Sequence, residues 1–261
     1  MMQRSFFRGL ATVVLGLMSL VASSWATPAP GPDGFGYKSA TIAFNFRDIS
    51  GTGTQAFSVP TDDNVTGAVG IGFNFSFYGT SYTDAYIGSN GFITFSPGQS
   101  DGCCDGGPLP GTPNPSNLVA GWFTDLLNGN FGGATNGQIF YQTTGLAGAR
   151  EFVVEYLNNP YYFLINNTNT FEIVLHEGSN DIELQYLQTT ADNHNRSVGI
   201  ENLGGTVGLE IVNDRTTLLN AQGICISTGN ASCPTATVPE PTSLALLSLA
   251  LVAGGLFRRK Q

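Results

Sequence analysis

The middle of the chain is a series of short apolar runs separated by turn-forming residues. Within a run, apolar and polar positions alternate or apolar residues follow one another, with many β-branched and aromatic side chains. Gly, Asn, Asp or Pro bounds each run, a pattern typical of β-strands. The runs are Ala40–Phe46, Ala68–Phe77, Ala85–Phe95, Leu118–Phe123, Gln138–Thr143, Glu151–Leu157, Thr170–Glu177, Asp181–Leu187, Ser197–Glu201, Val207–Val212 and Gly223–Ser227. They predict an all-β fold, a β-sandwich or barrel-like single domain.

Two local signals indicate tight turns. Phe171–Tyr186 contains two alternating segments joined by Gly-Ser-Asn-Asp, which predicts a β-hairpin. Ser89-Asn90-Gly91 predicts a turn, because Asn and Gly tolerate a positive φ.

Aromatic residues at every second position of the predicted strands are candidates for the core. An alternative is that one or two of them form a sugar-stacking platform, but aromatics at strand spacing are buried far more often. The core candidates are Phe73, Phe75, Phe77, Phe92, Phe95, Trp122 and Phe123.

Composition supports the β prediction and narrows the partners. Charged residues make up 11% of the 261 residues, aromatics another 11%, and there are 34 glycines, a mixture that disfavours both a helical protein and a disordered one. Half of the ten basic residues lie near the two ends, so the middle is strongly acidic. An acidic surface repels phosphate backbones, and we expect no nucleic-acid partner.

The N-terminal residues 1–26 have the pattern of a signal peptide. Arg4 and Arg8 precede the apolar run Leu10–Val21, and small residues stand at −3 and −1 of a cleavage site after Ala26. The run is short for a transmembrane helix. We therefore expect export from the cytoplasm.

The C-terminal end has three parts in a fixed order. Pro239, Glu240 and Pro241 precede the uncharged segment 242–257, and a basic cluster, 258–260, follows it. A helix of about sixteen residues spans roughly 24 Å, enough to cross a thinned membrane with the basic cluster on the cytoplasmic side. The end closely resembles the PEP-CTERM sorting signal. That resemblance implies recognition and processing by an exosortase, transient anchoring in the inner membrane, and a host that makes exopolysaccharide or biofilm.

A second resemblance covers most of residues 41–212. The segment Gly70–Phe95 contains Phe-Tyr-Gly and Tyr-Ile-Gly-Ser-Asn-Gly-Phe-Ile-Thr-Phe, and Leu118–Leu126 adds an apolar strand with a Trp and an acidic residue. These pieces look like those of nidogen-like extracellular domains. The resemblance implies a non-catalytic β module of matrix and adhesion proteins, and it transfers no binding residues.

Together these features divide the chain into five parts. We expect a signal peptide at 1–26, a flexible lead-in at 27–39, a nidogen-like β-rich domain at 40–227, a stalk at 228–237 and the sorting signal at 238–261.

Four cysteines lie in the exported part, and an even number in an oxidising compartment favours disulfides. They are Cys103, Cys104, Cys225 and Cys233. Three connectivities are open. We favour pairing of the first two with the last two, because a bridge between adjacent cysteines needs a distorted backbone.

The candidate chemistry is sparse, and we expect no catalytic residues and no enzyme activity. His176 and His194 are the only histidines, and no nucleophile or phosphate-binding motif occurs. Paired carboxylates such as Glu151 and Glu155 fit solvated strand faces. We expect no cofactor except a candidate structural Ca²⁺ in the acidic loop at Asp62 and Asp63.

The sequence thus predicts an exported cell-surface or extracellular protein whose β domain mediates adhesion, in association with exopolysaccharide or other surface proteins. Two alternatives remain at this point: a glycan-binding module with a defined sugar pocket, and a secreted polysaccharide hydrolase.

Overall fold

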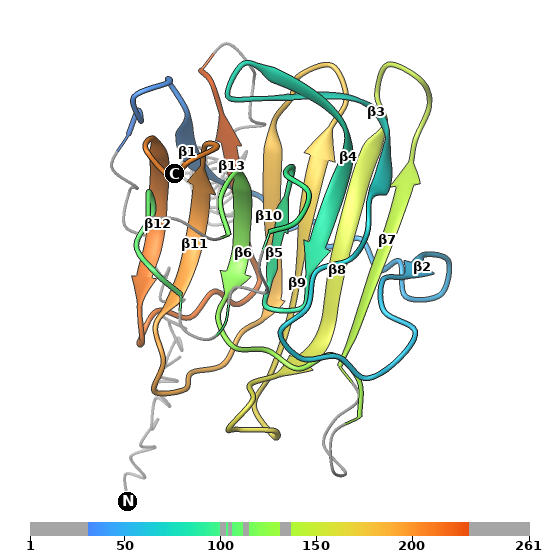
Figure 1. Ribbon diagram of the computed structural model, residues 1–261, viewed down its shortest axis with the longest axis vertical. Coiled ribbons are helices and arrows are strands. Elements are labelled where there is room, and N and C mark those ends of the chain that lie inside the picture. The colour runs from blue at the N-terminus through green and yellow to red at the C-terminus, as the bar shows by residue number, and fades with distance from the viewer. Residues whose placement is uncertain (1–30, 100–102, 104–105, 112–114, 131–136, 230–261) are drawn as a thin grey trace, which may run out of the picture.

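The computed structural model describes residues 31–99, 103, 106–111, 115–130 and 137–229. The described chain is all β, as the sequence predicts. Thirteen strands form two antiparallel sheets that face one another (Figure 1). The strands are β1 Lys38–Ile42, β2 Thr54–Gln55, β3 Val69–Phe77, β4 Thr80–Gly88, β5 Phe92–Thr94, β6 Leu118–Phe123, β7 Gln138–Thr144, β8 Glu151–Pro160, β9 Thr168–His176, β10 Ile182–Gln188, β11 Arg196–Glu201, β12 Gly208–Asp214 and β13 Gln222–Ser227.

The two sheets have seven and six strands. The first runs in the order β1-β13-β10-β9-β8-β7-β2, and the second in the order β12-β11-β6-β5-β4-β3. The predicted hairpin is confirmed: β9 and β10 pair with Leu175 opposite Ile182, and Asn180 adopts a φ of 57° in the turn. The fold is therefore a β-sandwich.

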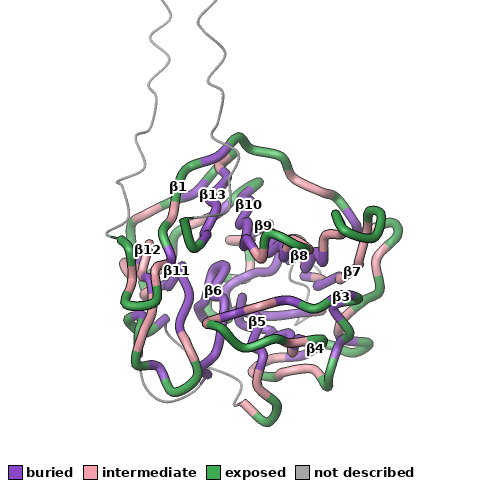
Figure 2. Tube along the Cα trace, turned by 90° about the horizontal axis from the view of Figure 1, so that it is seen from above, coloured by how far each residue is buried: buried purple, intermediate pink, exposed green. Residues whose placement is uncertain are grey.

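The inner faces of the two sheets meet in one core, which is the buried band between the layers in Figure 2. Alternate residues of each strand point inward, so Phe152, Val154 and Tyr156 of β8 face the core while their neighbours face outward. All seven aromatic core candidates are buried. Phe92 and Phe123, however, belong to a second cluster with Leu109, on the outer side of the six-stranded sheet.

Buried tyrosine hydroxyls connect the two sheets. The hydroxyl of Tyr156 donates to the carbonyl oxygens of Gly88 and Phe92, at 2.9 and 2.8 Å, and that of Tyr186 donates to Gly121 O at 2.7 Å. Because a hydroxyl buried without a partner would destabilise the fold, these bonds fix how the sheets sit on one another.

Residues 31–37, which the sequence assigns to a flexible lead-in, pack against the domain. Asp33 accepts hydrogen bonds from the backbone N–H groups of Phe35, Gly36 and Tyr37, and Tyr37 is buried. The hydroxyl of Tyr78 donates to Asp33 at 2.8 Å. The turn around Asp33 thus belongs to the folded unit.

Candidate functional site

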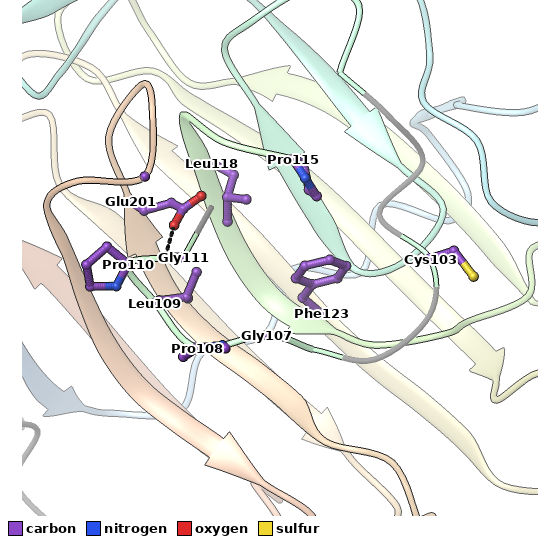
Figure 3. A pocket seen from close by; sticks show the side chains of 11 residues that line it. Cys103, Gly107, Pro108, Leu109, Pro110, Gly111, Pro115, Leu118, Phe123 and Glu201 are labelled. Carbon is purple, nitrogen blue, oxygen red and sulfur yellow. Dashed lines mark hydrogen bonds between the residues drawn. The ribbon is translucent and has the colours of Figure 1, made fainter. Parts of the chain in front are cut away.

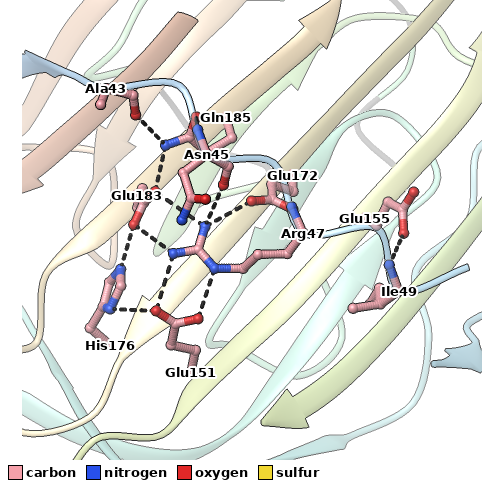
Figure 4. Close-up of polar contacts among 10 residues, drawn as sticks. All are labelled: Ala43, Asn45, Arg47, Ile49, Glu151, Glu155, Glu172, His176, Glu183 and Gln185. Atoms are coloured by element: carbon pink, nitrogen blue, oxygen red, sulfur yellow. Dashed lines mark hydrogen bonds and ion pairs between the residues drawn. The ribbon is translucent and has the colours of Figure 1, made fainter. Parts of the chain in front are cut away.

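The outer face of the seven-stranded sheet is covered by the strap, which we define as residues 43–53 between β1 and β2. Arg47 of the strap reaches down to three carboxylates from neighbouring strands (Figure 4). Its guanidinium lies 2.7 Å from Glu151 of β8, 2.9 Å from Glu172 of β9 and 3.1 Å from Glu183 of β10. The carboxylates of this face, which the sequence places in solvent, are therefore engaged beneath the strap.

Burial and the single guanidinium shape the charge of this cluster. Burial raises the pKa of Glu172 to about 8 even though Arg47 donates to it. Burial also opposes ionisation of Glu183, but hydrogen bonds from His176 and Arg47 outweigh it and lower the pKa of Glu183 to about 2. Burial thus favours the protonated form of Glu172, which limits repulsion among three carboxylates that face one guanidinium.

Both histidines are engaged with carboxylates. His176 Nε2 lies 2.8 Å from Glu183 and forms one edge of the Arg47 cluster (Figure 4). His194 Nδ1 lies 2.8 Å from Asp192, and its ring stacks on Phe163 with centroids 5.7 Å apart. These contacts fix the positions of both imidazole rings.

An acidic cluster forms where two loops meet. Asp62 and Asp63, the candidate calcium residues, lie with Asp125, which follows β6, so that one carboxylate oxygen of each falls within 4.8 Å of the others. Asn90 in the turn between β4 and β5 donates to Asp63 at 2.8 Å, and its own carbonyl oxygen accepts the N–H of Leu126. The sequence finds the first two aspartates but not the third, because Asp125 comes from a distant segment.

The loop carrying Asp125 also contains buried polar atoms. Thr124 Oγ1 and Asn128 Oδ1 are both buried and have no hydrogen-bond partner among the described residues. The backbone of Asn128 pairs in both directions with Thr61, which precedes Asp62. The two loops that carry these oxygen-bearing residues thus lie side by side, and oxygen atoms are the ligands that Ca²⁺ takes.

A pocket of about 480 Å³ lies on the outer side of the six-stranded sheet, under the loop of residues 106–111 (Figure 3). Leu118 and Phe123 of β6 and Glu201 of β11 form its floor, and Pro108 and Pro110 of the loop lie opposite. Its lining combines apolar side chains with backbone polar groups, and Glu201 supplies the one carboxyl group among the described lining residues.

Two glutamates fasten the loop over this pocket. Glu201 Oε2 accepts the N–H of Gly111 at 2.7 Å, and Glu210 Oε2 of β12 accepts the N–H of Leu109 at 2.8 Å. Burial raises the pKa of Glu201 to about 7, although the N–H of Gly111 opposes the change. The sequence gives no sign of Glu201, which occupies an ordinary strand position next to a turn.

The exposed aromatic side chains lie in segments between the strands. Tyr162 and Phe163, in the loop between β8 and β9, are 45% and 68% exposed. The strand aromatics do not form an exposed sugar-stacking platform, because their side chains are buried in the two clusters, although Phe123 also borders the pocket under residues 106–111.

The predicted disulfides are only partly visible. Of the four cysteines the structure describes Cys103 and Cys225, and neither is a free thiol. Cys104 and Cys233 lie outside the described residues. The connectivity stays a prediction.

Both termini lie outside the described residues, including Ala26 and the sorting motif Pro239, Glu240 and Pro241. Within the part of the chain that the structure describes, no helix is long and apolar enough to span a membrane.

Two family models match the chain. The model "NIDO related" matches residues 36–237, and the model of the PEP-CTERM protein-sorting motif matches residues 237–260. Neither the curated proteins nor the solved structures contain a match. The sorting motif implies export, sorting to the surface and processing by an exosortase. With more than half of its length matched, the chain belongs to the NIDO-related family and ends in a PEP-CTERM sorting motif.

Proposed function

We propose that this NIDO-related domain is a non-catalytic adhesion domain, displayed on the cell surface, that associates with exopolysaccharide or neighbouring surface proteins. The main supporting observation is that groups capable of acid–base chemistry hold the fold together. Glu151, Glu172 and Glu183 converge on Arg47, and His176 lies against Glu183. A hydrolase of polysaccharide would instead need two carboxylates facing one open cleft.

The route to the surface follows from the two ends. The signal peptide directs export, the segment 242–257 holds the chain in the inner membrane, and the exosortase then removes the basic end. The mass of the surface-exposed protein should therefore lack residues 258–261. Surface protein that retains this end would contradict the processing step.

The adhesion role is tested in cells. Deleting residues 40–227 while keeping both ends should abolish attachment or aggregation without reducing export of the remaining chain. Because the strap cluster is not a catalytic site in this proposal, replacing Glu151 with Gln should leave attachment unchanged. Attachment that survives the domain deletion would exclude the role.

A second candidate function, a glycan-binding module with a defined sugar pocket, is favoured by the pocket under residues 106–111. It combines apolar walls with a polar group, as small-ligand sites do. The exposed rings of Tyr162 and Phe163 add a surface on which sugar rings could stack. Binding to an array of glycans would distinguish this specific recognition from general adhesion.

We further propose that the acidic cluster of Asp62, Asp63 and Asp125 binds a structural Ca²⁺. Three carboxylates within 4.8 Å repel one another unless a cation or protons offset the charge. Carboxylate and amide oxygens are the ligands that Ca²⁺ takes. The ion would join the loop before β3 to the loop after β6, so removing it should lower the melting temperature.

A further inference from the structure

The carboxyl group of Glu201 lies in a setting that lacks a positive partner. The residue is 2% exposed, and no Lys, Arg or His among the described residues forms an ion pair with it. Its Oε2 accepts the N–H of Gly111, whereas Oε1 accepts no hydrogen bond from the described chain and is not sealed from solvent. Oε1 is therefore the atom that a ligand entering the pocket could reach.

Around Glu201 the pocket presents apolar side chains together with polar backbone groups. Leu118, Phe123 and Pro115 lie on one side, and Pro108 and Pro110 of the loop lie on the other, as Figure 3 shows. A volume of about 480 Å³ falls within the range of roughly 300–1,000 Å³ that small-ligand sites occupy. A ligand that fits can offer carbon-bound hydrogens to the apolar side chains and a hydrogen-bond donor to Glu201.

The charge of the exported domain points to the same ligand. Residues 27–239 contain five basic residues and eighteen acidic ones, a net charge of −13. Such a surface repels acidic polysaccharides and attracts cationic polymers over the Debye length, about 8–10 Å at ordinary ionic strength. Neutral sugars would gain no binding affinity from this electrostatic attraction.

We propose that the pocket binds a hexosamine unit with a free amino group, in which the ammonium pairs with Glu201 and the ring packs on Phe123 and on Pro108 and Pro110 of the loop. This inference rests on the proposed association with exopolysaccharide and assigns it a ligand class. A bound ammonium would give the buried carboxylate the partner that the chain does not supply.

The direct test is binding of the purified protein to a β-linked glucosamine hexamer, with the N-acetylated hexamer and the neutral glucose hexamer for comparison. We expect the amine form to bind at least tenfold more tightly than either. Equal affinity for all three, or no binding of the glucosamine hexamer, would overturn the proposal. Tri-lysine serves as a peptide cation, and displacement of the hexamer by tri-lysine at equal concentration would show a site for any cation rather than for a sugar.

A matched pair of variants distinguishes two effects on ligand binding: loss of the carboxylate charge in the pocket, and loss of a hydrogen bond that supports the loop. Both Glu201 and Glu210 hold the loop through one backbone N–H, but only Glu201 lines the pocket. Glu201→Gln should weaken binding of the glucosamine hexamer at least tenfold, and Glu210→Gln less than twofold. Equal losses in the two variants would mean that loop support, not the ammonium contact, explains the effect, and the proposal would fail.

The unmodified protein gives a second readout in case Glu201→Gln does not fold. The hexamer should shift the amide resonance of Gly111, which donates to Glu201, more than that of Leu109, which donates to Glu210. The reverse order would refute the site.

Binding to the host's own exopolysaccharide distinguishes failure of this inference from failure of the proposed function. If Glu201→Gln still binds that polymer as the wild type does, the ligand assignment fails while the adhesion function stands. If the wild type binds no exopolysaccharide, the association with exopolysaccharide on which this inference rests fails as well.

Discussion

Arg47 contacts Glu172 twice: its backbone N–H donates to Oε2 and its Nη1 to Oε1, both at 2.9 Å. Glu172 is fully buried, and on the outer face of the seven-stranded sheet it lies opposite Glu155 of β8 and Gln185 of β10. The strap and the sheet are thus joined by one side chain that contacts three adjacent strands. This makes Arg47 the main electrostatic contact on that face.

Replacing Arg47 with Met should destabilise the protein by about 3–5 kcal/mol, because it leaves buried carboxylates without a cation. The free energy of unfolding from urea titration measures this change. Arg150 offers a control: it pairs with Glu177 at 2.6 Å, but at the surface. Arg150→Met should cost much less, and equal losses would show that the Arg47 cluster is no more important than a surface ion pair.

Gly91→Ala should destabilise the protein by about 3 kcal/mol or more, through strain and overpacking. Gly91 has a φ of 82°, and a Cβ there would lie 2.1 Å from the carbonyl oxygen of Trp122. Its own carbonyl oxygen accepts the N–H groups of Gly121 and Trp122, so the turn cannot move away.

Gly98 provides the matched control for this substitution. Its φ is 69°, and nothing lies within 4 Å of the position that a Cβ would take. Gly98→Ala should therefore cost only the strain of the left-handed conformation, about 1–2 kcal/mol. Similar unfolding free energies for the two alanine variants would mean that the contact with Trp122 does not limit position 91.

The hydrophobic pattern predicts the strands whose inner residues fill the core. It does not predict strand segments that lack a run of apolar residues. The first half of β4, residues 80–84, is polar and mostly exposed, yet it pairs with β3. The two-residue edge strand β2 is missed for the same reason. The predicted run Ala40–Phe46 overshoots β1, because its last residues leave the sheet and begin the strap.

The residues of the candidate sites are likewise predicted from the sequence only where a local pattern reveals them. Asp62 and Asp63 are visible in the sequence because they are adjacent, whereas Asp125 joins them only through the pairing of Thr61 with Asn128. The role of Arg47 depends on the path of the strap across three strands. Such convergence depends on tertiary structure, which a single sequence does not display.

The stability of the protein should fall as the pH rises from about 5 to 8. Burial raises the pKa of Glu155 and of Glu201 to about 7, from an ordinary value of 4.5. Between these two values the folded protein holds protons that the unfolded chain has released, so raising the pH favours unfolding. The lowered pKa of Glu183 contributes stability above pH 4.5 that is lost only at more acid pH, and it does not reverse the trend.

Thermal melts at pH 5, 6, 7 and 8 measure this dependence, and Glu155→Gln identifies one source. The amide is neutral throughout and can still accept the N–H of Ile49, which lies 2.9 Å from Glu155 Oε2. The variant should therefore show a smaller fall in melting temperature than the wild type. A wild-type melting temperature that rises over this range would contradict the assignment of raised pKa values.

The response to calcium distinguishes a cation site from three aspartates that share protons. With a cation at Asp62, Asp63 and Asp125, EDTA should lower the melting temperature of the wild type by roughly 5–10 °C, the effect of about 2.7 kcal/mol of binding energy at a hundredfold excess over Kd. Asp125→Asn should abolish that response.

The direction of the change in Asp125→Asn is the decisive measurement. If Ca²⁺ binds, removing a ligand lowers the melting temperature in calcium, because the stabilising ion is held less tightly. If no cation binds, removing one of three clustered charges relieves repulsion and raises the melting temperature, with or without EDTA. Asp84→Asn, an exposed position outside the cluster, should change neither the melting temperature in calcium nor the EDTA response. A stabilised Asp125→Asn protein would therefore rule out the calcium site.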